Sequence, residues 1–342
     1  MDAGESRGDQ TRGGLPRVGW GGLPEVRPPV TIRNDALRPV QQRIAFATIA
    51  GPALGTALAV GLAVAQGLTS LDLGFLVIGS VLGMLSLELG YHRLLAHRSF
   101  KTHPWLQTLL AIGASMQGQG RVTHWVANHR RHHVHSETPD DPHSPHVRKR
   151  RDGPRGRTEG EPLGVLRGLV HAHWGHMLTD DVPNGTLFAR DLNQDRALRR
   201  VSQSYGLITW IGLLLPALIG WAISGAPGAL SGFLWGGLAR MFVVQNTTWA
   251  VASFCHRFGP APYEAGDDSR NFLPVALVSF GSGYQNNHHA FPNSAYLGFR
   301  WWELDVSAWA IRALALAGLA WDVKRATPSE LALKKRPAQN WK

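Results

Sequence analysis

The sequence contains a single cysteine, Cys255, among its 342 residues. One thiol cannot form a disulfide within the chain, so the class of small secreted proteins held together by disulfides is excluded. The sequence also has no Cys-rich iron–sulfur motif, no Gly-rich dinucleotide loop after a strand and no haem-attachment motif. If the chain performs redox chemistry, its reducing equivalents must therefore come from a separate protein.

Charged residues are scarce over four long stretches. Ala45–Gly67 has none, and as an α-helix with about 1.5 Å rise per residue it covers roughly 34 Å, enough to cross the ~30 Å hydrocarbon core of a bilayer. Leu71–Gly90, Gly206–Ser224 and Ala229–Phe254 are similarly apolar. Because short turns join these stretches in pairs, the sequence predicts an all-α polytopic membrane protein with four transmembrane helices in two hairpins, embedded in a lipid bilayer.

Basic residues are distributed unevenly around these stretches. The turns within the two hairpins contain no Lys or Arg, whereas the N-terminal arm, the central segment and the C-terminal part are basic. Cytoplasmic segments of membrane proteins carry such an excess of positive charge, so we expect both termini and the central segment to be cytoplasmic. Anionic lipid headgroups explain the net charge of +11, and we expect no nucleic acid partner.

Composition divides the chain into three parts. Residues 1–35 are rich in Gly, Arg and Pro and lack the apolar core of a signal peptide, which predicts a disordered N-terminal arm. Residues 36–325 contain the apolar stretches and are expected to form one membrane domain. Residues 326–342 are expected to form a C-terminal tail.

Most of the sixteen histidines fall at the expected cytoplasmic ends of the spans or in the loops between them. Residues at i, i+3 and i+4 share one face of a helix, so His129, His132 and His133 are expected to direct three imidazoles to one site. The same spacing recurs near the end of the chain, in Gln285, His288 and His289.

Three further histidines complete the pattern. His92 and His97 lie where the second span leaves the membrane, and His256 ends the fourth. A spacing of five residues corresponds to about 140° around an α-helix, which favours ligands on either side of a metal pair. Imidazole binds Zn, Cu, Fe and Ni, but a structural zinc site needs only four ligands and usually includes thiolates. Eight imidazoles therefore predict two metal ions.

The segments around these histidines resemble those of the membrane-bound fatty acid desaturases. They read HRLLAHRSF from His92, WVANHRRHHVHSETPDDPHSP from Trp125 and YQNNHHAFP from Tyr284. The resemblance extends from about Ala45 to Trp321 and is greatest to bacterial acyl-CoA desaturases of the stearoyl-CoA desaturase type.

This resemblance implies a four-span helical fold whose cytoplasmic helical cap holds a diiron site. It implies O2-dependent desaturation of a fatty acyl chain in a bacterial cell membrane. The expected substrate is acyl-CoA, with another acyl carrier or a lipid as the alternative, and Δ9 is one candidate position for the double bond. Electrons would come from a ferredoxin or a flavoprotein reductase. The expected ligands of the two Fe2+ ions, with no catalytic residue beyond them, are His92, His97, His129, His132, His133, His256, His288, His289 and Gln285.

The sequence departs from the family pattern at three positions near the expected metals. Gln285 stands where the family usually has histidine, Ala252 where it has asparagine and Asn128 where it has aspartate. Two other functions stay open on the sequence alone. One is a membrane hydroxylase or other oxygenase with the same diiron fold, and the other is a catalytically silent relative.

Overall fold

The structure is a computed structural model that describes residues 28–32, 35–149, 160–179 and 181–337. Three of its helices are long and apolar enough to cross a membrane: Arg38–Gln66, Ser70–Ala96 and Tyr205–Phe254. Large apolar side chains on them point outward, as Val64 does with 83% of its surface exposed. Because only lipid can cover so long an apolar surface, the prediction of a polytopic membrane protein is confirmed.

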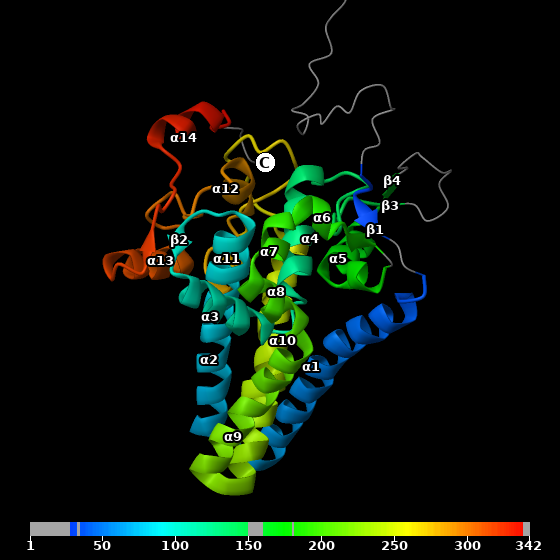
Figure 1. Ribbon diagram of the computed structural model, residues 1–342, viewed down its shortest axis with the longest axis vertical. Helices are drawn as coiled ribbons and strands as arrows, with labels where there is room; N and C mark the ends of the chain where they lie inside the picture. The colour runs from blue at the N-terminus through cyan, green and yellow to red at the C-terminus, as the bar shows by residue number, and fades with distance from the viewer. Residues whose placement is uncertain (1–27, 33–34, 150–159, 180, 338–342) are drawn as a thin grey trace, which may run out of the picture.

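The third of these helices folds back on itself. It consists of α9 (Tyr205–Ser231), a π-helical segment (Gly232–Ala239) and α10 (Arg240–Phe254). Ser224 and Gly225 have non-helical backbone angles, and the chain reverses at this point at the lower end of the molecule in Figure 1. The two arms pack so closely that a Cβ atom on Gly232 would overlap the carbonyl group of Pro216. The structure therefore has three long apolar helices where the sequence predicted four, and the third contains the reversal.

The first two long helices are α1 (Arg38–Gln66) and α2 (Ser70–Leu85), and a π-helical segment (Ser86–Ala96) continues the second. Thr69 begins α2 with a capping box, in which its backbone N donates to Asp72 and its hydroxyl accepts from the Asp72 backbone N. Ser231 donates to the other carboxylate oxygen of Asp72 at 2.5 Å. This bond joins the start of α2 to the end of α9.

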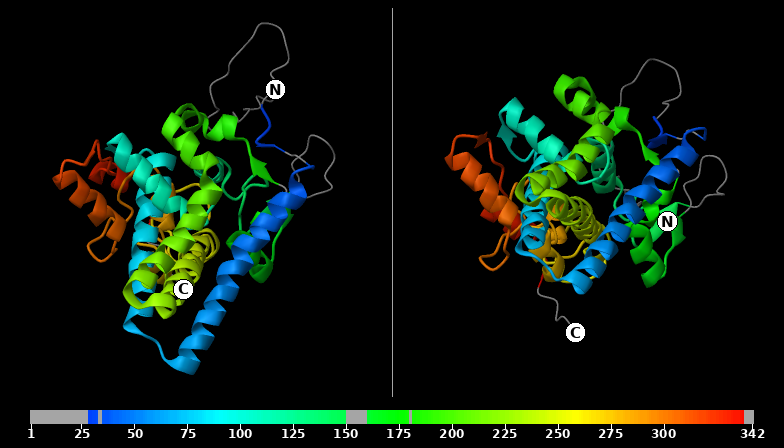
Figure 2. Two further views of the ribbon diagram at one scale, coloured as in Figure 1. Left: turned by 60° about the horizontal axis from the view of Figure 1, so that its bottom comes forward. Right: turned by 90° about the horizontal axis from the view of Figure 1, so that it is seen from below.

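Shorter helices build a cap at one end of the long ones (Figure 1). They are α3 (Pro104–Ser115), α4 (Val122–His135), α5 (Val165–His173), a 3-10 turn (Gly175–Leu178), α6 (Gly185–Phe188), α7 (Arg190–Gln194), α8 (Arg196–Gln203), α11 (Leu273–Val278), α12 (Gln285–Ala290), α13 (Val306–Leu316) and α14 (Pro328–Lys334). Seen from below in Figure 2, α1 runs along one side of the other long helices and the cap helices extend beyond them.

Strands occur only as short antiparallel pairs within the described residues. The pairs are β1 (Thr31–Ile32) with β5 (Val182–Pro183), β2 (Lys101–Thr102) with β6 (Ala320–Trp321), and β3 (Val147–Lys149) with β4 (Gly160–Pro162). The all-α prediction is therefore correct for the body of the protein, and these ladders make the fold mostly helical instead of purely helical.

The expected domain boundaries stay predictions. Most of the expected arm of residues 1–35 lies outside the described residues, and β1 within it pairs with a strand of the cap. The expected tail of residues 326–342 begins with α14, whose Leu331 packs against a cluster that contains Tyr263 and Phe291.

A buried arginine joins the cap to the long helices. Arg240 begins α10, and its Nη1 donates to Oε1 of Gln117 at 2.5 Å. Its Nη2 donates to the Gly212 carbonyl at 3.0 Å and its Nε to the Gly236 carbonyl at 2.6 Å. A guanidinium inside an apolar bundle is costly unless it is hydrogen-bonded, so these bonds fix α10 against α9 and against the segment after α3.

Candidate metal centre

The second long helix ends in the π-helical segment, which carries His92. The backbone N of His97 donates to the His92 carbonyl at 3.1 Å, a bond between residues five apart. A π-turn is wider than an α-turn and aligns residues at i and i+5, so the two ring centroids lie 5.0 Å apart. The expectation that these two histidines flank a metal pair is wrong, because both belong to one group of potential ligands.

Five imidazoles form what we call the first cluster: His92, His97, His129, His133 and His288. Their Nε2 atoms converge. The Nε2 of His129 lies 2.6 Å from that of His97 and 3.1 Å from that of His133. The Nε2 of His288 lies 2.9 Å from that of His133 and 3.1 Å from that of His92.

Three imidazoles and one carboxamide form the second cluster: His132, His256, His289 and Gln285. The Nε2 atoms of His132 and His256 lie 3.3 Å apart. The Nε2 of Gln285 lies 2.9 Å from that of His289 and 3.4 Å from that of His256. All four side chains are buried. The structure thus brings all nine expected ligands together, and their assignment to metal ions stays a prediction.

The helices α4 and α12 each contribute ligands to both clusters. On α4, the histidines at i and i+4 point into the first cluster, and the histidine at i+3 points into the second. On α12 the order is reversed, since Gln285 and His289 belong to the second cluster and His288 to the first. The expectation that the three histidines of α4 share one site is therefore corrected, because each helix lies between the two clusters.

Four of the histidines also contact a carboxylate through Nδ1. The pairs are His92 with Glu88 at 3.0 Å, His132 with Asp141 at 2.9 Å, His256 with Glu137 at 2.9 Å and His289 with Asp267 at 2.5 Å. A ring that donates its Nδ1 proton to a carboxylate presents the lone pair of Nε2, as metal-bound histidines do. Facing lone pairs repel one another unless a cation lies among them. The donor atoms of both clusters therefore fit metal ions.

The electrostatics of the site also favour imidazoles with a free lone pair. Burial, with the neighbouring imidazoles, lowers the pKa well below the ordinary 6.5 in His129, His132, His133 and His288. These rings are neutral, which is the form that binds a metal. In His256 burial acts in the same direction, but the hydrogen bond and charge of Glu137 outweigh it and raise the pKa.

The four carboxylates did not follow from the histidine spacing. Glu88 had the clearest signal, since it precedes His92 by four residues on one helix. Glu137 and Asp141 lie within the second histidine-containing segment, but the sequence did not indicate which ring each would meet. Asp267 comes from the loop before α11, and only the fold places it beside His289.

The first cluster is partly accessible and the second is not. His97 and His133 line a cavity of about 360 Å³. The other residues that line it are Arg130, Val134, Leu187, Phe188 and Pro292. This opening gives a path from the surface to two of the expected ligands.

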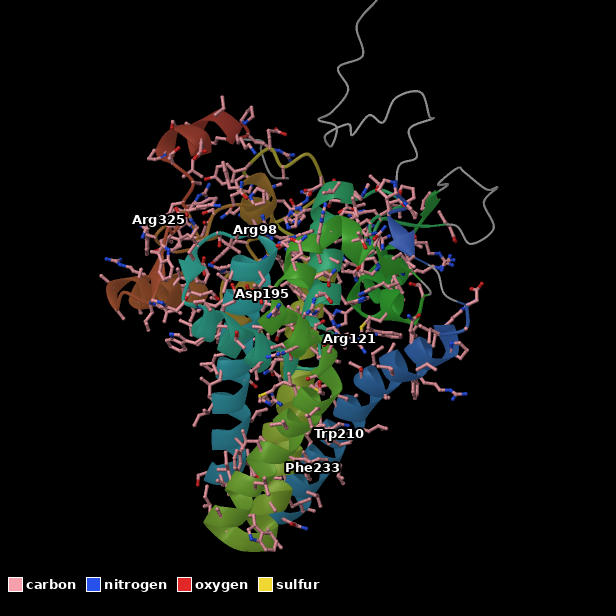
Figure 3. All side chains as sticks on the ribbon, in the orientation of Figure 1. Arg98, Arg121, Asp195, Trp210, Phe233 and Arg325 are labelled. Carbon is pink, nitrogen blue, oxygen red and sulfur yellow. The ribbon has the colours of Figure 1, made fainter. Side chains whose placement is uncertain are left out.

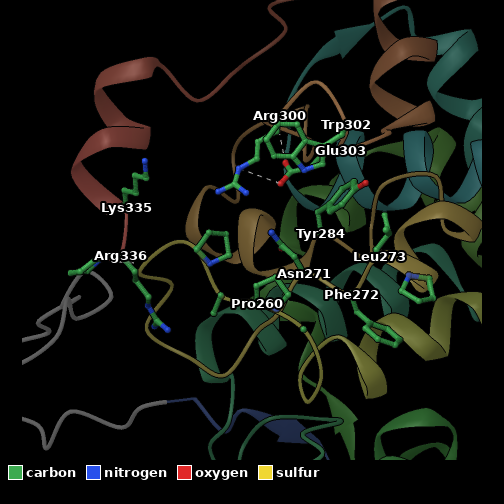
Figure 4. Close-up of a pocket in the computed structure, with 15 residues that line it drawn as sticks. Pro260, Asn271, Phe272, Leu273, Tyr284, Arg300, Trp302, Glu303, Lys335 and Arg336 are labelled. Atoms are coloured by element: carbon green, nitrogen blue, oxygen red, sulfur yellow. Dashed lines mark hydrogen bonds and ion pairs between the residues drawn. The ribbon is translucent and has the colours of Figure 1, made fainter. Parts of the chain in front are cut away.

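A larger cavity of about 540 Å³ lies among the loops around α11 and the C-terminal residues (Figure 4). Phe272, Leu273 and Trp302 line it together with Arg300 and Lys335. The fifteen described residues that line it include none of the nine expected ligands. This cavity is therefore separate from the clusters.

Comparison with known proteins agrees with this geometry. A family model described as fatty acid desaturase matches residues 68–324. The chain is 39% identical over 306 residues to the hex-5-enoyl-[acyl-carrier protein] acetylenase of Moorena producens, an alignment that covers 89% of this chain and 93% of that protein.

Two further relatives have other substrates in their names. The chain is 36% identical over 247 residues to the sn-1 stearoyl-lipid 9-desaturase of Anabaena variabilis, which covers 72% of this chain and 81% of the relative. It is 33% identical to the icosanoyl-CoA 5-desaturase of Limnanthes douglasii over 263 residues, 75% of this chain and 66% of the relative. The three names give three acyl carriers, so the expected resemblance to acyl-CoA desaturases in particular was too narrow.

Proposed function

This chain belongs to the fatty acid desaturase family, and on that premise we propose that it removes two hydrogens from a fatty acyl chain at a pair of histidine-bound iron ions. One observation supports the metal site above all others. Eight imidazoles and one carboxamide, drawn from segments far apart in the sequence, form two adjacent clusters at the end of long apolar helices.

The first iron ion would be held by the five histidines of the first cluster, and the second by the three histidines and Gln285 of the second. When bound, the iron ions supply an oxidant that uses O2, two external electrons and two protons to turn two adjacent methylenes into a double bond, with two waters as the other product. No further catalytic residue is proposed.

The protein itself orients the ligands and protects the site. The four carboxylates keep a proton on Nδ1 of their histidines and so leave Nε2 free for a metal. The ring of Trp125 stacks on that of His129 at 5.0 Å with an angle of 12° between the planes, which fixes one ligand of the first cluster. Burial of the second cluster excludes water from it.

We infer four membrane crossings. The reversal at Ser224 and Gly225 divides the third apolar helix into two arms, and neither this turn nor Leu68–Ser70 contains Lys or Arg. With the basic segments inside, the cap and both termini would be cytoplasmic in a bacterial cell membrane.

We propose that the acyl chain is attached to acyl carrier protein or to a membrane lipid. The two relatives with the higher identities among the three described act, by their names, on an acyl group on carrier protein and on a lipid. Acyl-CoA is the third candidate, since one relative at 33% identity uses it. For a lipid substrate we propose position 9, which two stearoyl-lipid desaturase relatives have in their names.

The decisive experiment is expression in a bacterial host, followed by mass spectrometry of its fatty acids with localisation of double bonds. Lipid, carrier-protein and CoA fractions are separated after a short isotope pulse, and the fraction that first contains the product identifies the carrier. The His132→Ala and His289→Ala variants serve as inactive controls. A product that has gained an oxygen atom would show a hydroxylase. Unchanged fatty acids from protein with two bound irons and a supplied reductant would show a silent relative.

A further inference from the structure

The opening to the first cluster suggests how electrons reach the site. We propose that it is the docking site of an acidic one-electron donor protein of the [2Fe–2S] ferredoxin type, and that electrons enter through His97 and His133. The inference rests on the proposed function. Both rings are half-buried and line the opening, whereas the histidines of the second cluster are buried. Electrons arriving from outside therefore meet the first cluster first.

The opening lies on the side of the protein that a water-soluble partner can reach. Its residues come from α4, α6 and the segment after α12, together with His97, which follows the π-helical end of the second long helix. In Figure 3, Arg98, the residue after His97, lies in the upper part of the molecule, and Trp210 and Phe233 lie on the long helices far below it. A water-soluble protein can therefore approach the opening from the side of the cap.

The border of the opening is apolar. Val134 has 56% of its surface exposed, and Leu187, Phe188 and Pro292 lie around the two histidines. Weak electron-transfer complexes bury small interfaces, so an apolar border around the exposed imidazole edges provides contact without tight binding. A donor that must leave after each electron needs such an interface.

Positive charge is fixed beside this border. Arg130 lines the opening and donates to Asp191 at 2.7 Å, and Arg98 donates to the same carboxylate at 2.5 Å. Arg130 also donates to the carbonyls of Leu95 and Ala96, which attaches its charge to the turn that carries His97.

The two arginines leave a net positive charge beside the border, because Arg98 and Arg130 share the one carboxylate of Asp191. Such a surface attracts and orients an acidic partner, and it does so most strongly at low ionic strength.

The backbone supports this arrangement. Arg98 has a φ of 50°, a left-handed conformation that is uncommon for a residue other than glycine and costs it free energy. Its backbone N donates to the Leu94 carbonyl at 3.1 Å, which ends the helix directly after His97. Its side chain is 63% exposed and lies next to the opening.

The electron count requires two encounters for each double bond. A [2Fe–2S] ferredoxin carries one electron, so two reduced ferredoxins are oxidised in turn. Their two electrons, with two protons from solvent and the two hydrogens of the acyl chain, reduce one O2 to two waters. A weakly bound donor that exchanges quickly suits this stoichiometry.

The test uses a plant-type [2Fe–2S] ferredoxin and the full-length protein in detergent. Arg98→Glu reverses a border charge and Val134→Asp places a carboxylate on the apolar border. The matched controls lie on α5. Arg167→Glu replaces an arginine that is 57% exposed and paired with Glu161, and Leu166→Asp replaces a leucine that is 77% exposed. Affinity for oxidised ferredoxin is measured with and without iron, together with the anaerobic rate at which the protein oxidises reduced ferredoxin.

Both border variants should lose at least tenfold in ferredoxin affinity and in this rate, and the loss should shrink as salt is added. The controls should bind as wild type does, and dithionite, which needs no docking, should reduce every variant at the wild-type rate. Unchanged affinity in the border variants, equal losses in the controls, or a loss of acyl-substrate binding instead would overturn the docking site. A wild-type protein that binds ferredoxin but forms no product with dithionite would contradict the proposed function alone.

Discussion

Nδ1 of His289 lies 2.5 Å from Oδ2 of Asp267, although the two residues are separated by 22 positions and belong to different segments. Asp267 is held in turn by Ser269, whose backbone N donates to its other oxygen at 3.0 Å. Each histidine of the second cluster has such a carboxylate partner, whereas His92 is the one histidine of the first cluster for which this contact is described. The second cluster therefore depends more on residues outside the ligand set.

Asp267→Asn should weaken the binding of the second metal ion. An asparagine keeps the shape of the side chain but removes the charge that holds the proton on Nδ1 of His289, and loss of such a partner costs ~10 to 100-fold in metal affinity. The matched control is Asp268→Asn, since Asp268 is the next residue, is exposed and lies 4.0 Å from His146. Iron per protein is measured along a chelator titration. Equal retention in both variants would contradict the role of Asp267.

The proposed topology predicts where introduced thiols will react. The natural Cys255 is buried, so single cysteines can be added to the otherwise unchanged chain. Leu333→Cys on α14 should react with an impermeant maleimide only after the cytoplasmic side is opened. Leu68→Cys and Ala226→Cys, which lie in the two turns, should react in intact cells. Labelling of all three from the same side would contradict four crossings.

The sequence predicted which residues form the site better than it predicted their geometry. Histidine spacing and the position of the apolar stretches indicated that nine side chains would meet at one end of the helices. The predicted placement of His92 and His97 on either side of a metal pair was wrong. That prediction assumed 3.6 residues per turn, whereas the segment Ser86–Ala96 is π-helical. No periodicity in the sequence marks the change, since it depends on packing around the site.

The contacts between ligands and carboxylates, and those between the long helices, were harder to predict for a related reason. Asp267 reaches His289 only through the path of the loop before α11. Likewise, the bond between Arg240 and Gln117 joins residues 123 positions apart. Contacts between distant segments follow from tertiary packing, which a single sequence does not display.

Arg240→Leu should destabilise the protein without removing a ligand. The substitution leaves Gln117 and the Gly212 carbonyl without their donor inside the bundle, and each buried unpaired group costs about 1–3 kcal/mol. Thermal unfolding in detergent should show a lower midpoint, and the iron content of the folded fraction should stay unchanged. Arg199→Leu, at an exposed position of α8, is the control. An unchanged midpoint for Arg240→Leu would show that these bonds do not stabilise the fold.

We expect Gln285 to decide how firmly the second metal ion is held. Its Oε1 is buried without a hydrogen-bond partner, and its Nε2 points at the Nε2 atoms of His256 and His289. The oxygen and nitrogen of a carboxamide have nearly the same shape, so turning the group over directs Oε1 at the metal position. An amide oxygen suits Mg, Ca and Mn better than iron, whereas imidazole suits iron.

The second ion would therefore have three imidazole ligands against five for the first, and Ala252, one turn before His256, offers no donor to compensate. We expect wild-type protein under mild chelation to release one iron well before the other. Gln285→His should slow this release, Ala252→Asn should slow it less because its amide is the weaker donor, and Gln285→Leu should bring the protein to one iron. Iron per protein against time in chelator, with Mössbauer spectra to distinguish the two sites, measures each effect. If wild type kept both irons equally and none of the three substitutions changed their release, the carboxylates of Glu137, Asp141 and Asp267 would be sufficient to offset the missing imidazole, and the ligand count would not decide the affinity.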